Sequence, residues 1–328
     1  MVIRFIKGSE LVNNSQTMLP GYATPLPHVI SADDFDTGMN GWMDLRPNFV
    51  DADFAAHSRE IDLEHWGSVM LSSATFAFSG THGSAAGTYS LRLGTRHPAA
   101  PASEPPAPGS MSLGIKRLSC PPAARLLRID AVIAYTTEQD RPGLGVDALR
   151  SFGLFVDLQD KEHRFMPGVR YVNAADGVRT RRWQFYKATD STDTDWNYGR
   201  EGWHQAGVDS QWFGQRSSDG STSATSWFED GEQSLIYNET DDKINWMPIS
   251  LTIDLRSRQY HSFRAHDREF TFPPGAGPTL AKTYENIGGL LNPVFFVETD
   301  GDRRVSLFVD SVVVSYATDE EAESEVGK

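Results

Sequence analysis

The stretch that most constrains the fold of this chain runs from Trp246 to Phe272 and has the pattern of antiparallel strands. In its first half Ile249, Leu251 and Ile253 alternate with polar residues. Because successive side chains of a strand point to opposite faces, this alternation predicts one buried apolar face and one polar face. After a polar bend, a second run carries the aromatic residues Tyr260, Phe263, Phe270 and Phe272. The stretch therefore predicts a β-hairpin or meander to which further strands can add.

Strand-like patterns recur along the rest of the chain, whereas helical periodicity is scarce. Core strands are predicted over 123–136, 152–158 and 165–172, each bounded by polar or turn-forming residues. A helical turn within 140–150 and a short helix within 276–287 are the only helical candidates, and neither shows sustained apolar spacing of three and four. The patterns favour an all-β, antiparallel fold with long loops and few short helices.

The length of 328 residues allows one large β domain or two smaller ones. We expect a single β-sandwich domain over residues 31–317. Residues 1–30 contain three prolines and are predicted to form an irregular N-terminal arm, and residues 318–328 are expected to be a solvated acidic tail. The Pro/Ala-rich segment 97–109 is expected to be a surface insertion.

The formal net charge of −14 argues against a partner that is a nucleic acid or an anionic membrane surface. No apolar run has the length needed to cross a bilayer. Cys120 is the only cysteine, which excludes an intramolecular disulfide and a thiolate metal cluster. The first residues, MVIRFIKGSELVNN, do not have the pattern of a secretory signal, so a cytoplasmic location is expected.

Three separated segments resemble strands of one known group of proteins. They are DDFD…GW within 33–42, GTYSLRL at 87–93 and LFVDSVVVSY at 307–316. In this order they resemble the first, third and last strands of jelly-roll carbohydrate-binding modules, which belong to the concanavalin A-like and galactose-binding-like β-sandwiches. The resemblance implies an antiparallel jelly-roll β-sandwich. It also implies a structural Ca²⁺ between Asp34 (or Asp36) and Asp310, and no other cofactor.

An acidic run offers one candidate for chemistry. On a strand, Glu60, Asp62 and Glu64 would project from the same face. Paired carboxylates of this kind suit a retaining glycosidase, in which one attacks the anomeric carbon and a second protonates the leaving oxygen. The EIDLE run resembles the E-I-D-x-E signature of laminarinase-like glucanases, which implies Glu60 as nucleophile, Glu64 as acid/base and Asp62 as the residue that tunes both. It lacks their Trp-containing approach, and an exposed acidic turn is the alternative.

An aromatic segment offers a second candidate, for binding. Six of the eight tryptophans lie between Trp183 and Trp246, interleaved with Tyr, Asn, Asp, Gly and Arg. Sugar rings stack on flat indoles while polar side chains bind their hydroxyls, and about half of these rings are expected in the core instead. The candidate ligand-binding residues are Trp183, Tyr186, Trp196, Tyr198, Arg200, Trp203, Trp212, Tyr237, Asn238 and Glu239.

Several motifs are missing from the sequence. There is no P-loop, no GxGxxG dinucleotide motif, no GxSxG elbow and no zinc-ligand spacing. Three hypotheses therefore stand: saccharide binding through an aromatic-rich groove, glycoside hydrolysis, and a structural or oligomer-forming role. The implied partner is an oligosaccharide in the first hypothesis and a second copy of the chain in the third.

Overall fold

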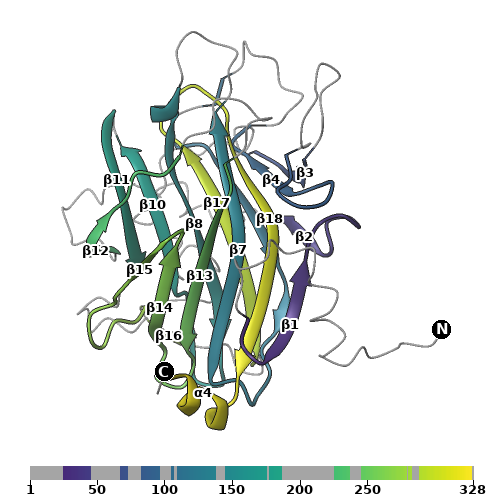
Figure 1. Ribbon diagram of the computed structural model, residues 1–328, viewed down its shortest axis with the longest axis vertical. Helices are drawn as coiled ribbons and strands as arrows, with labels where there is room; N and C mark the ends of the chain where they lie inside the picture. The colour runs from purple at the N-terminus through teal and green to yellow at the C-terminus, as the bar shows by residue number, and fades with distance from the viewer. Residues whose placement is uncertain are drawn as a thin grey trace.

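The computed structural model describes residues 25–45, 67–72, 83–96, 105–106, 109–137, 145–175, 177–186, 225–236, 245–278, 280–282 and 288–326. Within these ranges the chain forms two large antiparallel sheets, which Figure 1 shows as two layers. Residues from both sheets meet in one hydrophobic core. The predicted all-β, antiparallel β-sandwich is confirmed.

The first sheet contains eight of the described strands, in the order β15-β14-β13-β7-β18-β4-β3, with β1 also paired to β18. The strands are β1 (His28–Asp33), β3 (Val69–Leu71), β4 (Leu91–Gly94), β7 (Leu126–Thr137), β13 (Met247–Asp254), β14 (Gln259–Ala265), β15 (Arg268–Phe270) and β18 (Val305–Ala317). The two longest, β7 and β18, pair along their whole length at the centre of this sheet.

The second sheet contains ten of the described strands, in the order β12-β11-β10-β8-β17-β5-β2, with β6, β9 and β16 attached beside this path. The strands are β2 (Trp42–Asp44), β5 (Met111–Lys116), β6 (Leu118–Ser119), β8 (Leu149–Gln159), β9 (His163–Phe165), β10 (Gly168–Ala175), β11 (Val178–Tyr186), β12 (Thr225–Glu232), β16 (Leu280–Lys282) and β17 (Leu290–Thr299). A 3-10 turn, η3 (Val146–Ala148), precedes β8.

The predicted hairpin is formed by β13 and β14 and continues into β15. The side chains of Ile249, Leu251 and Ile253 are buried in the core, as the alternation predicts. Thr252, on the opposite face of β13, is buried as well. The reason is that β13 lies between β14 and β7, and the Arg128 guanidinium on β7 donates a hydrogen bond to the Thr252 hydroxyl (3.0 Å).

The three segments that resemble a carbohydrate-binding module meet at β18. Strand β4 pairs with Ser306–Val309 of β18, and β1 pairs with Val312–Tyr316. Of the acidic opening segment only Asp33 belongs to β1, because Phe35 adopts a positive φ of 61° and turns the chain. Two of the three segments therefore pair with the third, although the acidic residues after Asp33 lie in a turn.

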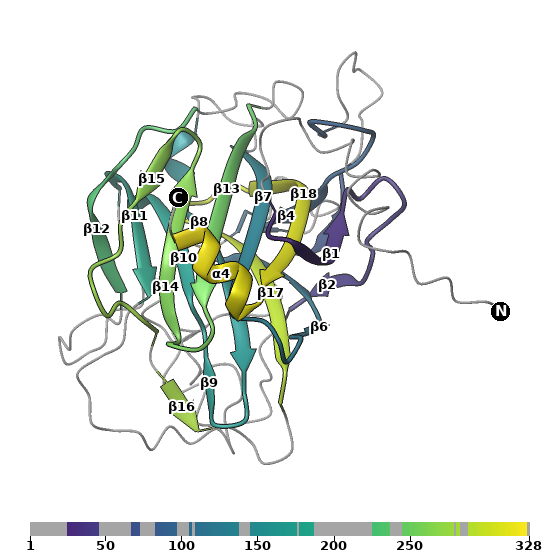
Figure 2. The same cartoon turned by 60° about the horizontal axis from the view of Figure 1, so that its bottom comes forward.

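The predicted ends of the domain differ from the structure in detail. Strand β1 begins at His28, so the last residues of the expected arm already belong to a sheet. Part of the expected acidic tail forms the helix α4 (Asp319–Val326), which lies at the end of the sandwich where β18 ends (Figure 2). Its Ala322 is buried against Leu26, Leu126 and Ala317, and this apolar contact holds the helix in place. Residues 280–282, expected within a helix, form β16 instead.

Among the described residues no helix combines the length and apolarity that crossing a bilayer requires.

Candidate functional site

The outer face of the ten-stranded sheet carries polar and charged side chains at its centre. On β8 the residues Phe152, Leu154 and Val156 point into the core, so the alternate residues, Ser151 among them, point to the outer face. The register places Glu298 of β17 opposite Ser151. These positions are buried and polar in a strand that is otherwise apolar, which is the feature that distinguishes a candidate site from ordinary packing.

Glu298 is the most perturbed acid of this face. Its side chain is completely buried, and the Ser151 hydroxyl donates a hydrogen bond to Oε2 (2.8 Å). The Nε atom of Arg150 lies 3.4 Å from Oε1 of Glu298. Burial raises the pKa of Glu298 from 4.5 to about 7, even though Arg150, Arg170 and Ser151 favour the charged form. The carboxyl therefore changes its charge near neutral pH.

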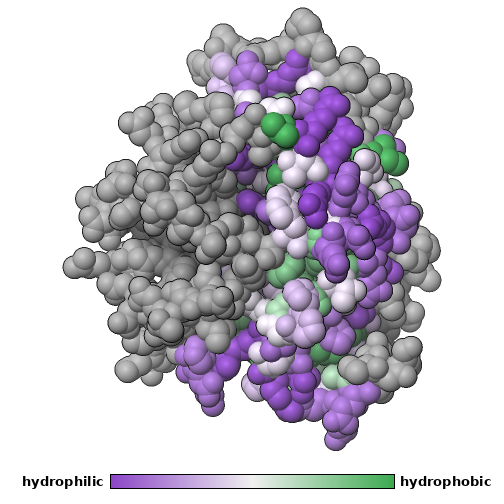
Figure 3. Space-filling view, turned by 90° about the vertical axis from the view of Figure 1, so that its left-hand side faces the viewer, coloured by the Kyte–Doolittle hydropathy of each residue, from purple (hydrophilic) through white to green (hydrophobic). Residues whose placement is uncertain are grey.

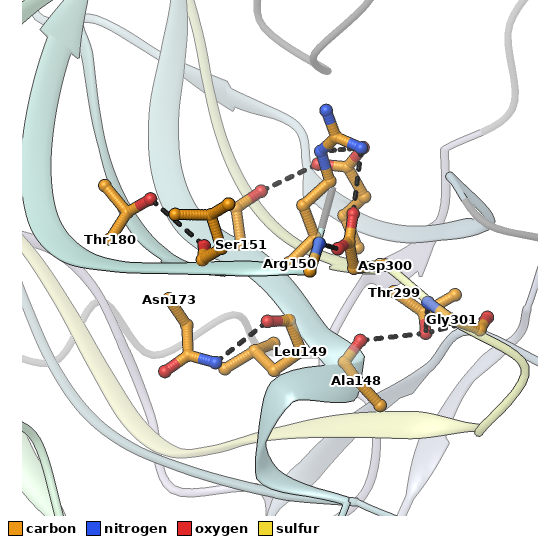
Figure 4. A network of polar contacts seen from close by, with 12 residues as sticks. Ala148, Leu149, Arg150, Ser151, Asn173, Thr180, Thr299, Asp300 and Gly301 are labelled. Carbon is orange, nitrogen blue, oxygen red and sulfur yellow. Dashed lines mark hydrogen bonds and ion pairs between the residues drawn. The ribbon is translucent and has the colours of Figure 1, made fainter. Parts of the chain in front are cut away.

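A network of hydrogen bonds fixes the backbone around Arg150 and around Thr299, the residue after Glu298, as Figure 4 shows. Arg150 binds the Asp300 carboxylate (3.0 Å), and this carboxylate also accepts the backbone N–H of Gly177 (3.1 Å). The Thr299 hydroxyl donates to the Ala148 carbonyl (3.0 Å). These contacts join β8, β17 and the turn before β11, so the outer face is held rigidly at this end.

A second polar row leads from the centre of the sheet to its edge. The Nε–H of Arg170 on β10 donates to the side-chain carbonyl of Gln184 on β11 (2.7 Å). Gln184 lies opposite Trp227 on the edge strand β12, so the two side chains share the outer face. The Arg182 guanidinium lies 5.3 Å from the centroid of the Trp227 ring, which is a cation–π contact.

Trp227 is the exposed tryptophan among those that the structure describes. Its side chain is 40% exposed, whereas Trp42 and Trp183 are buried and Trp246 is partly buried. An indole at the edge of a rigid sheet, with a guanidinium and a carboxamide beside it, can stack on an apolar ring face and bind hydroxyl groups at the same time.

A third polar group lies toward the other end of β8. Arg164 on β9 binds both carboxylate oxygens of Asp157 (2.6 and 2.8 Å), and the Asn292 amide donates to the same carboxylate (3.2 Å). Each of these three side chains is at least nine-tenths buried. Because the Asp157 carboxylate of β8 is bound from both β9 and β17, this group serves to hold the three strands together.

Comparison with known proteins places the chain in a family. Residues 10–318 match the model of a family described as "Domain of unknown function (DUF6772)". The chain belongs to this family. No curated protein matches it. The family description assigns no activity, so the DUF6772 chain has to be interpreted from its own residues.

The solved structures similar to this DUF6772 chain include lectin and carbohydrate recognition domains. The globular domain of T. cruzi calreticulin has a TM-score of 0.39 and 11% identity, over 90% of this chain and 91% of that one. The Emp46p carbohydrate recognition domain has a TM-score of 0.34 and 8% identity, over 90% and 96%. Winged bean acidic lectin has a TM-score of 0.37 and 7% identity, over 80% and 96%.

Two of the aromatic residues predicted to bind ligand lie in the interior. Trp183 is completely buried between the sheets, where its ring contacts Phe152 and Phe263 and its Nε1–H donates to Gln233 (2.8 Å). Tyr186 is 1% exposed. Neither ring offers a face to a sugar, and the reason for Trp183 is that it points to the inner face of β11. Both are removed from the binding set.

The remaining predicted site residues lie outside the described part of the chain. They are Trp196, Tyr198, Arg200, Trp203, Trp212, Tyr237, Asn238 and Glu239 of the binding set, and Glu60, Asp62 and Glu64 of the acidic run. Their roles stay predictions.

The three carboxylates predicted to hold calcium accept hydrogen bonds from different groups. The Asp310 carboxylate accepts the Ser84 hydroxyl (2.7 Å) and the Ala85 backbone N–H (2.9 Å). Asp36 accepts two backbone N–H groups of the same loop, those of residues 88 and 89 (2.6 and 3.0 Å). Asp34 instead accepts the backbone N–H of Asp36 (3.2 Å). Of the two alternatives, Asp36 is therefore the residue that shares a loop with Asp310.

These two carboxylates supply fewer ligands than calcium takes. Burial raises the pKa of Asp310, and the charge of Asp36 raises it further, which shows that the two acids repel each other. Within the described ranges no group of three or more His, Cys, Asp or Glu side chains could hold a metal ion. Calcium commonly takes about six to eight oxygen ligands, so backbone carbonyls or water would have to complete such a site.

Trp227 and Glu298 are not among the site residues predicted from the sequence. A local signal existed for the first: Trp227 is followed by the core residue Phe228, so strand alternation alone turns the indole to the outer face. No comparable signal marks Glu298, which ends an apolar run and acquires its partners only when β17 pairs with β8.

Proposed function

We propose that the protein binds saccharides on the outer face of its ten-stranded sheet, at the edge formed by β11 and β12. The observation that carries this proposal is the exposed indole of Trp227, held in a regular strand beside Arg182 and Gln184. This position keeps the predicted function and replaces the buried Trp183 by an accessible ring.

The chemistry of the edge suits a sugar ring. The apolar C–H face of a pyranose packs on an indole, and the hydroxyls at its rim bind planar donors and amides. Arg182 supplies such a donor, and its position is fixed because Nη2 donates to the Phe228 carbonyl (3.1 Å). Gln184 is fixed by Arg170 in the same way. Little side-chain freedom is lost on binding when both groups are already held.

The surface around this edge is suited to a polar ligand. Figure 3 shows the side of the molecule on which β11, β12 and β15 lie, and its described part is mainly hydrophilic with a few small hydrophobic spots. Val178 on β11 and Ile236 after β12 are exposed as well, but Trp227 is the aromatic ring among these three, and a flat ring is the side chain on which a sugar stacks.

The test is binding to an array of neutral and uronic acid oligosaccharides, followed by titration of the strongest binder against tryptophan fluorescence. Trp227→Ala should weaken binding by about tenfold or more, because stacked aromatic rings dominate such contacts. Tyr89→Ala is the matched control, since Tyr89 is 38% exposed and lies on the loop that Asp36 binds. Equal binding by both variants would contradict the proposed location.

The same protein samples separate the two other hypotheses. Release of reducing sugar that is lost in Glu60→Gln would favour hydrolysis by Glu60, Asp62 and Glu64. A blank array together with concentration-dependent self-association that Trp227→Ala abolishes would favour the interaction hypothesis. Either result would replace simple saccharide binding as the function.

A further inference from the structure

A cavity of about 740 Å³ lies at the end of the sandwich beside α4, away from the β11–β12 edge. Its volume falls within the range of about 300–1,000 Å³ that is common for small-molecule sites. It is lined by Ser119, Cys120, Pro121, Pro122, Ala123, Ala124, Arg125, Leu158, Gln159, Asp160, Lys161, Phe165, Leu255, Arg256, Gly288, Gly289, Leu290 and Asp319. All of these belong to the described part of the chain.

One wall of the cavity is apolar and fixed. It combines the segment 120–124, which contains two adjacent prolines, with Leu158, Phe165 and Leu290. The backbone is held by hydrogen bonds from the N–H of Cys120 to the Gly289 carbonyl (2.7 Å) and from the N–H of Gly289 to the Gln159 carbonyl (2.9 Å). The cavity is therefore preformed and offers an apolar surface to a ligand.

Two of the three cations that line the cavity are already neutralised. Arg125 binds both carboxylate oxygens of Asp254 (2.8 and 2.6 Å) and lies 3.4 Å from Asp319. Arg256 also binds Asp319, at the beginning of α4. These ion pairs tie the helix to the turn after β13, so both guanidinium groups have a structural role.

Lys161 is the remaining cation. Within the described residues its ammonium group makes no hydrogen bond or ion pair, and it lies in the turn between β8 and β9. The neighbouring acid Asp160 does not serve it, because its carboxylate binds the Arg258 guanidinium (2.7 Å) and the backbone N–H of Glu162 and His163 (2.7 Å each).

The ion pairs of the lining leave Lys161 as its cation without a carboxylate partner among the described residues. Arg125 and Arg256 are paired with Asp254 and Asp319, and Asp160 is paired with Arg258. An ammonium group that is not already paired can attract an anion.

We propose that this cavity is a binding site for a small organic carboxylate with an apolar body. The carboxylate would pair with the Lys161 ammonium at the opening, and the apolar body would lie against the prolines, Phe165 and Leu290. The proposal does not depend on saccharide binding, because Trp227, Arg182 and Gln184 do not line the cavity.

The only cysteine of the chain makes the test specific. Cys120 lines the cavity, and burial raises the pKa of its thiol to about 11, so alkylation will be slow and sensitive to what fills the space around it. Phenylacetate is the probe, and its neutral analogue phenylacetamide is the control ligand. Alkylation of Cys120 by iodoacetamide, followed by intact-mass spectrometry, should slow at least about fivefold with saturating phenylacetate and much less with the amide.

Two variants locate the effect. Lys161→Gln should weaken phenylacetate binding by about tenfold, whereas Arg179→Gln, which removes a positive charge on β11 outside the lining, should not change it. Gly288→Leu should abolish binding by filling the cavity, because the nearest atom to a Cβ there is the Lys161 Cγ at 3.9 Å and no backbone obstructs it. Circular dichroism verifies that each variant is folded.

Calorimetric titration of phenylacetate provides the affinity independently of alkylation. Binding that Lys161→Gln and Gly288→Leu weaken, and that Trp227→Ala leaves unchanged, is the expected result. Absence of heat and of protection up to millimolar phenylacetate, or equal binding by Lys161→Gln, would overturn the proposal. Neither result bears on the saccharide site.

Discussion

The hydroxyl of Tyr260 donates a hydrogen bond to the backbone carbonyl of Tyr186 (2.6 Å) and thereby joins the two sheets through the core. The same oxygen accepts the backbone N–H of Gly168 (2.9 Å). Tyr260 belongs to the eight-stranded sheet, whereas the other two residues belong to the ten-stranded sheet. Burial raises the pKa of Tyr260, so the hydroxyl keeps its proton and its role as donor.

Replacement of Tyr260 by Phe should lower the free energy of unfolding by about 1–3 kcal/mol, because the carbonyl and the N–H that it serves would remain buried without a partner. The ring can stay in place, since it stacks on Phe272 with centroids 4.3 Å apart. Denaturant titration measures the change. Tyr89→Phe removes an exposed hydroxyl and should have almost no effect. Equal stability of both variants would show that the bond between the sheets contributes nothing.

Replacement of Ile253 by Ala should cost about 2–4 kcal/mol, through the lost transfer free energy and the cavity left behind. Ile253 is completely buried near the end of β13, where it lies between Leu127 of β7 and Tyr260 of β14. Ile236→Ala provides the comparison, because Ile236 is 63% exposed and its loss should change stability by less than about 0.5 kcal/mol. A change below about 1 kcal/mol at Ile253 would contradict the register of the hairpin.

Glu298 should make stability depend on pH. Its pKa is about 7 in the folded protein and ordinarily 4.5, so between these values the folded state holds a proton that the unfolded state has released. The contribution of Glu298 to the free energy of unfolding is therefore fully present below about pH 4.5, and it is lost as the pH rises through about 7.

The variant Glu298→Gln removes this titration and keeps the shape of the neutral acid. Its free energy of unfolding, relative to that of the native protein, should increase by up to the order of 3 kcal/mol between about pH 4.5 and 7.5. Other buried acids, such as Asp130 and Asp310, are common to both proteins and cancel in the difference. Parallel stability curves over this range would show that Glu298 titrates at its ordinary pKa.

The parts of the fold that could be predicted from the sequence depend on local contacts. The alternation of Ile249, Leu251 and Ile253 identifies β13, and the next aromatic run pairs with it after a short turn. No long-range information is needed for such a hairpin. The pairing of β7 with both β13 and β18, in contrast, joins segments that are far apart in sequence, and no local pattern selects it.

The candidate site could be predicted only by segment and not by residue. Aromatic density directs attention to the chain between Trp183 and Trp246, but composition treats all its indoles alike. Strand direction separates them: Trp183 points to the core, and Trp227 points away from it. Trp227 comes next to Arg182 and Gln184 only when β12 pairs with β11. Many residues separate these two strands in the sequence, so no local pattern predicts that they pair.

The last prediction concerns calcium at the loop that Asp36 and Asp310 share. A cation between the two acids would offset their mutual repulsion, so added Ca²⁺ should raise the thermal midpoint of the native protein and EDTA should reverse the shift. Asp310→Asn is an informative variant, because an amide oxygen can still accept the Ser84 hydroxyl and the Ala85 N–H while the charge that attracts the cation is removed. This variant should fold and lose the response to Ca²⁺. A native protein whose midpoint is unchanged by Ca²⁺ and EDTA would show that the two carboxylates serve to hold the loop through hydrogen bonds alone.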